Sequence, residues 1–233
     1  MSKTTILLAE DHTIFRECFR RMLELDGSLE VVCEAQHGRQ AVALAKQLHP
    51  ALVLMDISMP LLNGFEATRQ IRKQCPDTKV MILSAHNDQM YVQNAVECGA
   101  QGFVFKQTSF DKILEAIKEV QNGHVYFSSM SGDFPEPAVA RLPAHANGVD
   151  RKLTARETEV LQLIAEGNAN KQTAMELGVS SKTVEKHRHN LMAKLKIYDT
   201  ASLTRHAIEI GIVEAPIPGE INKTYTSPKP IKP

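Results

Sequence analysis

Short apolar runs that alternate with helical patterns occupy the first 127 residues of this chain. Runs such as Ile6-Leu7-Leu8-Ala9 and Ala51-Leu52-Val53-Leu54-Met55 are typical of strands that are buried on both faces of a parallel sheet. We expect strands at Thr5–Ala9, Leu29–Ala35, Ala51–Met55, Lys79–Ser84 and Gly102–Phe105. We expect helices at Thr13–Asp26, Arg39–Leu48, Gly64–Gln74, Gln89–Cys98 and Phe110–Asn122. These alternating elements predict an α/β domain with a doubly wound, five-stranded parallel sheet.

Apolar residues at helical spacing mark the first and last of these helices. In the first helix they are Ile14, Cys18, Met22 and Leu25, and in the last they are Ile113, Ile117 and Val120. Ser109 is placed to cap the last helix, and Gly123 follows its end.

The composition changes beyond residue 127, which predicts two domains. Residues 128–150 are rich in Ser, Pro and Gly and show no periodicity, as expected of a linker. Residues 151–212 carry a purely helical pattern with ten basic and seven acidic side chains, whereas residues 1–127 carry 13 basic and 15 acidic side chains. This asymmetry points weakly to nucleic acid as a partner of the second domain. The proline-rich tail, residues 213–233, is expected to be disordered.

Polar side chains stand at the end of four predicted strands. Glu10 and Asp11 follow the first strand, Asp56 follows the third, Ser84 ends the fourth and Lys106 follows the fifth. The carboxyl ends of parallel strands form one edge of a sheet, so these groups converge there. Carboxylates suit Mg²⁺, Asp56 is placed to attack phosphorus, and Lys106 would neutralise a phosphoryl group. The pattern therefore predicts a site for Mg²⁺ and phosphoryl transfer.

This half of the chain resembles the receiver domain of response regulators, which has a flavodoxin-like fold. The resemblance rests on Leu8-Ala9-Glu10-Asp11, Val53-Leu54-Met55-Asp56-Ile57-Ser58-Met59-Pro60 with Asn63-Gly64, Leu83-Ser84-Ala85 and Gly99-Ala100-Gln101-Gly102-Phe103-Val104-Phe105-Lys106. It implies that Asp56 accepts phosphate from a sensor histidine kinase and that the Ser58 backbone carbonyl joins Glu10, Asp11 and Asp56 around Mg²⁺. It further implies that Ser84 and Phe103 are switch residues. Gln107 stands where many receivers have proline.

A helix-turn-helix pattern follows from Leu153. Thr154 and Glu157 form a capping box for a first helix, Gly178 ends a short second helix, and Ser180 caps a third helix that reaches about Lys196. On a helical wheel of the third helix, Val184, Leu191 and Leu195 share one face, and His187 lies near it. Lys182, Lys186, His189 and Ala193 lie opposite, which predicts a basic face that would fit the major groove.

This segment resembles the LuxR-type helix-turn-helix of NarL/FixJ response regulators. The matching residues are Leu153 to Leu161, Gly167, Asn170-Lys171, Val179-Ser180, Thr183 to Leu191 and Lys194-Leu195. The resemblance implies double-stranded DNA as the partner. It assigns base contacts to Glu185, Lys186 and His189, and phosphate or positioning contacts to Lys171, Lys182, Thr183 and Arg188. It also implies a homodimer contact through Leu203, Ala207 and Ile210, for which packing within the domain is the alternative.

Cysteine spacing and hydropathy exclude several classes of protein. Cys18, Cys33, Cys75 and Cys98 show no C-x-x-C spacing and fall in helix or strand patterns, as free thiols in a reducing compartment do. The sequence shows neither the apolar run of a membrane span nor the apolar region of a signal peptide. We therefore expect a cytoplasmic protein without a membrane partner.

The favoured hypothesis is a response regulator that is phosphorylated on Asp56 and then binds DNA as a dimer. Without phosphate, its receiver would cover part of the recognition helix or of the helix Ala201–Ile210. One alternative is a phosphohydrolase, but Ser58 stands where such enzymes carry a second aspartate as acid and base. Two further alternatives are an output domain that contacts only proteins, and DNA binding that does not depend on phosphorylation.

Overall fold

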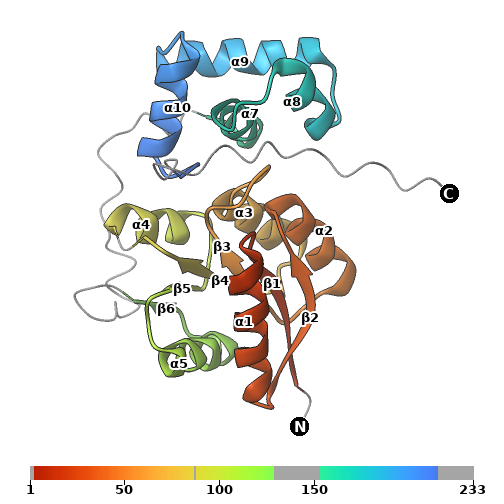
Figure 1. Ribbon diagram of the computed structural model, residues 1–233, viewed down its shortest axis with the longest axis vertical. Coiled ribbons are helices and arrows are strands. Elements are labelled where there is room, and N and C mark those ends of the chain that lie inside the picture. The colour runs from red at the N-terminus through yellow and green to blue at the C-terminus, as the bar shows by residue number, and fades with distance from the viewer. Residues whose placement is uncertain (1–2, 87, 129–152, 215–233) are drawn as a thin grey trace, which may run out of the picture.

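The computed structural model describes residues 3–86, 88–128 and 153–214 as an α/β domain followed by an all-helical domain (Figure 1). The predicted linker, apart from Ser128, and the predicted disordered tail beyond Glu214 lie outside the described residues. None of the described helices combines the length and the apolar character that a membrane span needs.

The α/β domain contains one parallel sheet in the order β2-β1-β3-β4-β5-β6. Its strands are β1 (Thr4–Ala9), β2 (Leu29–Ala35), β3 (Leu52–Asp56), β4 (Lys79–Ser84), β5 (Gly102–Phe105) and β6 (Tyr126–Phe127). The doubly wound parallel sheet is confirmed, but the prediction of five strands was wrong. Tyr126 and Phe127 pair with Gly102 and Phe103 as a sixth, edge strand. Two residues are too few to show a strand pattern in the sequence.

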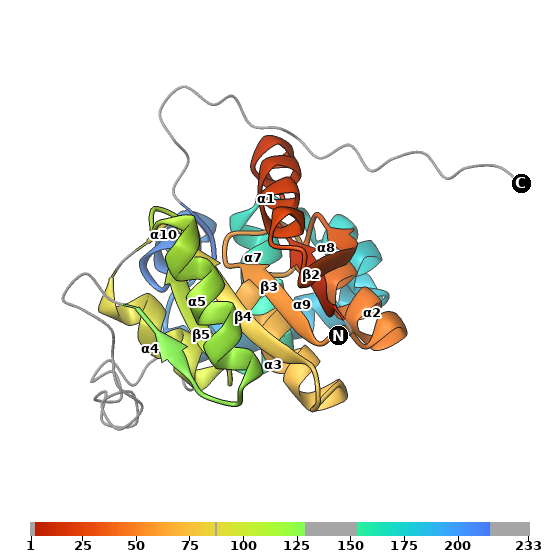
Figure 2. The ribbon, with the colours of Figure 1, turned by 90° about the horizontal axis from the view of Figure 1, so that it is seen from below.

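Five helices cover the two faces of this sheet (Figures 1 and 2). They are α1 (Thr13–Leu25), α2 (Gly38–Leu48), α3 (Gly64–Gln74), α4 (Gln89–Glu97) and α5 (Phe110–Gln121). One apolar cluster joins α1 and α5 to alternate residues of the strands, including Ile6, Leu8 and Leu54. The residues between them, including Leu7 and Val53, pack against α2 and α3, and α4 covers the same face beside β4 and β5. Burial on both faces explains why the strands appear as continuous apolar runs.

The apolar stripe that marked α1 in the sequence faces outward. Ile14 and Leu25 are 81% and 85% exposed, whereas Phe19 and Leu23 are 4% and 0% exposed. Two apolar stripes run along this helix, and the one that contains the aromatic rings is buried against the sheet. Aromatic rings bury a larger area than aliphatic side chains do, which favours that choice.

The helical domain contains α7 (Ala155–Ala165), α8 (Asn170–Leu177), α9 (Ser181–Leu195) and α10 (Thr200–Glu209) around its own apolar cluster. The predicted capping box starts α7, because Thr154 Oγ1 accepts from Glu157 N at 3.3 Å and Glu157 Oε2 accepts from Thr154 N at 2.7 Å. Ser180 caps α9, and Gly178 ends α8 with φ +62. The ends of these helices thus follow from local capping signals that the sequence contains.

An ion network joins the two domains through Glu159 of α7, whose side chain is only 9% exposed. Its carboxylate lies 3.3 Å from Arg39 of α2, accepts a hydrogen bond of 3.0 Å from Gln70 of α3, and lies 2.7 Å from Arg156 of its own helix. A buried carboxylate that loses such partners is costly, so this network fixes α7 against α2 and α3.

Candidate functional site

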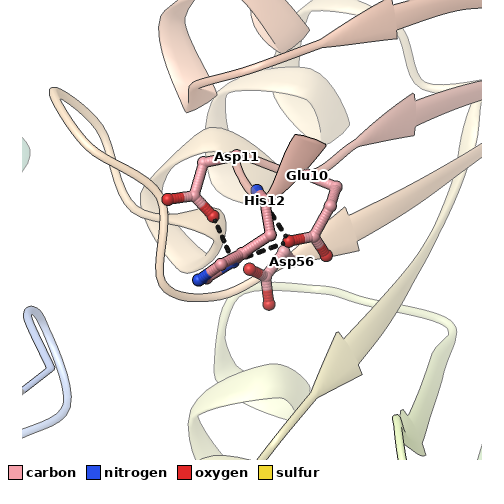
Figure 3. Close-up of side chains that lie close together, drawn as sticks. All are labelled: Glu10, Asp11, His12 and Asp56. Carbon is pink, nitrogen blue, oxygen red and sulfur yellow. Dashed lines mark hydrogen bonds and ion pairs between the residues drawn. The ribbon is translucent and has the colours of Figure 1, made fainter. Parts of the chain in front are cut away.

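The sheet register brings the acidic side chains together at one edge. Ala9 pairs with Met55 and Asp56 pairs with Leu83, so the ends of β1, β3 and β4 lie side by side. Ligand atoms of Glu10, Asp11, His12 and Asp56 all lie within 4.8 Å of one another (Figure 3). Glu10 and Asp56 are 1% and 3% exposed. The convergence that the strand ends predict is therefore present, with His12 as an additional member.

Lys106 reaches this cluster from the end of β5. Its ammonium lies 2.9 Å from Asp56 Oδ1 and 2.8 Å from Glu10 Oε2, and it also sits 4.9 Å above the centre of the Phe15 ring. Burial alone would lower the pKa of Lys106, but the carboxylates of Asp56 and Glu10 raise it above its ordinary value. Lys106 is thus a fixed positive charge beside the Asp56 carboxylate.

Three carboxylates, those of Glu10, Asp11 and Asp56, lie together in the cluster beside Lys106 and His12. Burial raises the pKa of Asp56 to about 7, against the opposing effect of the Lys106 ammonium. Burial also raises the pKa of Asp11, while His12 opposes that rise. Asp56 Oδ2 is buried and has no hydrogen-bond partner among the described residues. An orphaned, buried carboxylate oxygen among three carboxylates suits a hard divalent cation, so the residues fit Mg²⁺.

The predicted switch residues Ser84 and Phe103 lie in strands β4 and β5. Ser84 Oγ donates a hydrogen bond of 2.9 Å to the carbonyl of His86 and accepts one of 3.0 Å from the backbone N–H of the same residue. Phe103 is fully buried, with its ring edge-on to Phe105 at 5.4 Å. Ser58 is half-buried in the loop that follows Asp56.

Sequence reasoning missed residues that hold the site in place. Arg16 of α1 is 5% exposed and donates a hydrogen bond of 2.7 Å to the carbonyl of Glu10, which fixes the acidic turn. His12 lies 3.0 Å from Glu10 and 2.9 Å from Asp11. In the sequence, His12 directly follows the acidic pair Glu10-Asp11, and this position could have identified it as a member of the site. Arg16 gave none, because a basic residue in a helix is usually solvated.

Close backbone contact at Gly64 yields a prediction on stability. A methyl group on Gly64 would lie 2.0 Å from the carbonyl oxygen of Asp56. Gly64→Ala should therefore displace the loop after β3 and reduce the free energy of unfolding by about 1–3 kcal/mol. Denaturant titration followed by circular dichroism measures this. An unchanged free energy of unfolding in Gly64→Ala would contradict the steric argument.

The predicted recognition face of α9 is open to solvent. Lys182, Glu185, Lys186 and His189 are all exposed, while Val184, Leu191 and Leu195 are buried on the opposite side. This confirms the two faces of the helical wheel. His187 is half-buried. Among the described residues, this exposed face makes no contact with the receiver, so the predicted covering of the recognition helix does not occur in this arrangement.

The residues with predicted phosphate contacts differ in their surroundings. Lys171 and Lys182 are exposed, and Thr183 hydrogen-bonds Ser180 at the start of α9. The Arg188 guanidinium donates hydrogen bonds of 2.7 Å to Thr200 and 3.3 Å to Asn170, which ties α9 to α10 and α8. Arg188 thus has a structural role within the domain.

The dimer contact through Leu203, Ala207 and Ile210 stays a prediction, and two of these residues, Leu203 and Ala207, favour the alternative of packing within the domain. Both are 0% exposed inside the helical core, and Ile210 packs against that core. A side chain without exposed surface cannot contact a second chain unless the domain repacks. The apolar spacing of α10 therefore reports packing within the domain, which was the stated alternative.

Comparison with known proteins agrees with both halves of this description. Residues 6–118 match the response regulator receiver domain, and residues 151–207 match the LuxR family of bacterial regulatory proteins. The transcriptional regulatory protein DegU of Brevibacillus brevis is 34% identical over 234 residues, which covers 91% of this chain and 96% of that protein. The chain belongs to the NarL/FixJ-type response regulators.

Two further similar proteins support the assignment of this chain to the response regulators. The transcriptional regulatory protein MctR of Rhizobium johnstonii is 38% identical over 211 residues, covering 91% of this chain and 96% of that protein. A LuxR-family response regulator from Aurantimonas sp. superposes with a TM-score of 0.54 at 31% identity, covering 60% of this chain and 96% of that chain. These relatives are named as regulators, so the protein is a regulator of transcription with a LuxR-type DNA-binding domain and not a phosphohydrolase.

RcsB from Salmonella enterica serovar Typhimurium, solved bound to the promoter rprA, shares the fold over both domains. It superposes with a TM-score of 0.59 at 24% identity and covers 88% of this chain and 98% of that chain. At this identity the likeness shows the fold alone.

Proposed function

We propose that this response regulator is phosphorylated on Asp56 by a sensor histidine kinase and then binds double-stranded DNA as a dimer. The observation that carries the proposal is the buried Asp56 carboxylate between Lys106 and the Glu10–Asp11 pair. A carboxylate oxygen of Asp56 would bond to phosphorus as the bond between phosphorus and the donor breaks. Lys106 would then neutralise charge on the phosphoryl oxygens.

Glu10, Asp11, Asp56 and the Ser58 carbonyl would hold Mg²⁺ beside this carboxylate. When bound, the ion supplies positive charge to the developing phosphoryl group and favours the ionised form of Asp56. Ser84 Oγ would have to leave the His86 carbonyl in order to donate to a phosphoryl oxygen, because a hydroxyl has one proton. That exchange is the local step by which phosphorylation would change the loop after β4, and Phe103 would repack with it.

On DNA, α9 would enter the major groove with Lys186, Glu185 and His189 towards base edges. Lys171, Lys182 and Thr183 would meet phosphates. Any dimer contact of α10 would use its exposed side, which contains Ala201 and Arg205, because Leu203 and Ala207 are buried. The receiver faces the other end of α10, where Gly211 lies against the ring of Tyr91 in α4.

DNA binding without phosphorylation is a second candidate, favoured by the exposed recognition face. A gel series with operator DNA at matched protein concentrations separates the two. Under the proposal, treatment with acetyl phosphate and Mg²⁺ should strengthen binding and shift the protein to a dimer in sedimentation. Equal binding before and after labelling of Asp56 would favour the second candidate.

Asp11→Ala tests the metal site separately. We expect weaker Mg²⁺ binding, because the variant removes one of three clustered carboxylates, and a slower phosphoryl uptake that higher Mg²⁺ concentrations restore. Calorimetric titration with Mg²⁺ measures the affinity. Unchanged affinity would remove Asp11 from the ligand set.

A further inference from the structure

The loop between β3 and α3, residues 57–63, is held by the helical domain as well as by the receiver. It follows Asp56 directly and contains Ser58, whose carbonyl the proposed function assigns to Mg²⁺. Three of its backbone groups pair with the side chains of Gln162 in α7 and of Glu166, the residue that directly follows α7. Asn63 N donates to Gln162 Oε1 at 2.8 Å, Leu61 N donates to Glu166 Oε1 at 3.1 Å, and Gln162 Nε2 donates to the carbonyl of Met59 at 3.0 Å.

The orientation of the Gln162 amide is determined by its partners. Its Nε2 faces two acceptors, the Met59 carbonyl and, at 2.7 Å, Glu166 Oε1, while its Oε1 faces the N–H of Asn63. The reversed amide would set oxygen against two oxygens and NH₂ against N–H. Gln162 is also only 1% exposed, so water does not compete for these bonds.

The Met59 carbonyl and the Ser58 carbonyl belong to consecutive peptide units. The Ser58 unit is held within the receiver, because Met59 N donates to the Ile57 carbonyl at 3.1 Å, and Gln162 holds the next unit through the Met59 carbonyl. Only the two backbone dihedrals of Met59 separate these restraints, so loss of the Gln162 bond would loosen the conformation that directs the Ser58 carbonyl. The other end of the loop is fixed within the receiver, where Gly64 N donates to the Ile57 carbonyl at 2.8 Å and Asn63 Oδ1 caps α3. Gln162 therefore completes the restraint on the side that faces the helical domain.

We propose that Gln162, a residue of the DNA-binding domain, is a positioning residue for the metal and phosphorylation site of the receiver. It holds the loop after Asp56 in the geometry that presents the Ser58 carbonyl, and it thereby raises Mg²⁺ affinity. This inference rests on the proposed function of Asp56 and goes beyond it, because it makes the output domain part of the phosphorylation apparatus. Coupling of this kind is reciprocal, so Mg²⁺ binding would in turn stabilise the docked domains.

The test is a Mg²⁺ titration of the full chain by calorimetry, supported by electron paramagnetic resonance of free Mn²⁺. Gln162→Ala is expected to raise the Kd by about two- to tenfold, the value of one or two hydrogen bonds. In acetyl phosphate, the Mg²⁺ concentration for half-maximal labelling should rise by the same factor, while the rate at saturating Mg²⁺ stays unchanged.

Two further variants keep the test specific. Gln162→Glu retains the size and the acceptor for Asn63 N but has no donor for the Met59 carbonyl, so it should weaken Mg²⁺ binding at least as much as alanine does. Lys194→Gln breaks the ion pair of 2.6 Å with Glu157 inside the helical domain and leaves the receiver contacts intact, so its Kd should match the parent. Circular dichroism confirms that each variant is folded.

The outcomes distinguish a failure of the proposed function from a failure of the positioning role of Gln162. If the parent binds no Mg²⁺ and Asp56 is not labelled, the proposed function fails. If the parent binds Mg²⁺ and is labelled, but both Gln162 variants keep the parent Kd, the positioning role is overturned while the proposed function stands. A Kd that rises equally in Lys194→Gln would also overturn it, because the effect would then reflect general loosening of the helical domain.

Discussion

Asp56→Asn is expected to reduce phosphoryl uptake from acetyl phosphate and Mg²⁺ to the background of an unreactive protein. The amide has the size of the carboxylate and can still accept from Ile57 N, which donates to Asp56 Oδ1 at 2.9 Å. It lacks the negative charge of the nucleophile, and Lys106 keeps its other partner, Glu10, at 2.8 Å. The fold should therefore persist while the chemistry stops. Intact-protein mass spectrometry before and after incubation measures the loss.

Asp88→Asn is the matched control for this result. Asp88 precedes α4 and its side chain makes no capping hydrogen bond, so removal of its charge should leave phosphoryl uptake unchanged. Equal labelling of Asp56→Asn and the parent would refute Asp56 as the acceptor. It would then direct attention to Glu10 and Asp11, which are the other carboxylates at this edge of the sheet.

The sequence predicted this edge of the sheet because strand ends are a topological property. Apolar runs set the strands, parallel pairing aligns their carboxyl ends, and Glu10, Asp56 and Lys106 follow directly. No comparable rule connects Gln162 to Met59, because their proximity depends on how two separate domains dock. The role of Arg16 could not be predicted for a similar reason. Its burial depends on a tertiary contact, the hydrogen bond that it donates to the carbonyl of Glu10.

Apolar spacing also proved ambiguous wherever a helix carries more than one stripe. In α1 the spacing of Ile14 and Leu25 is helical, yet the stripe with Phe19 and Leu23 is buried. In α10 the spacing of Leu203 and Ala207 served the domain core rather than a partner. Periodicity predicts that a helix exists, whereas the surface against which it packs is decided by tertiary contacts.

The docked arrangement changes how regulation should be understood. The recognition face of α9 is exposed although α7 is fixed to the receiver through Glu159 and Gln162. The two domains are therefore in contact without covering α9, so this contact does not require that regulation act by covering α9. Phosphorylation could act instead on the end of α10, where Gly211 meets Tyr91 and Glu214 lies 3.0 Å from His86, the residue whose backbone binds Ser84.

Lys186→Ala should weaken binding to the specific operator by about 5- to 150-fold, which corresponds to the 1–3 kcal/mol of one good base contact. Binding to random DNA should fall much less. The reason is the position of Lys186 on the exposed face of α9, opposite the buried Val184 and Leu191. Titration of labelled operator and random duplexes at fixed salt gives the ratio of the two affinities.

Lys182→Ala provides the contrasting case on the same helix. Lys182 lies in the first turn of α9 and is exposed, where a phosphate contact is expected. Its loss should weaken operator and random DNA alike and reduce the slope of log affinity against log salt by about one. If instead Lys182→Ala altered specificity and Lys186→Ala altered only the salt slope, α9 would lie in the groove with a different rotation. The base-facing residues would then have to be sought nearer its first turn.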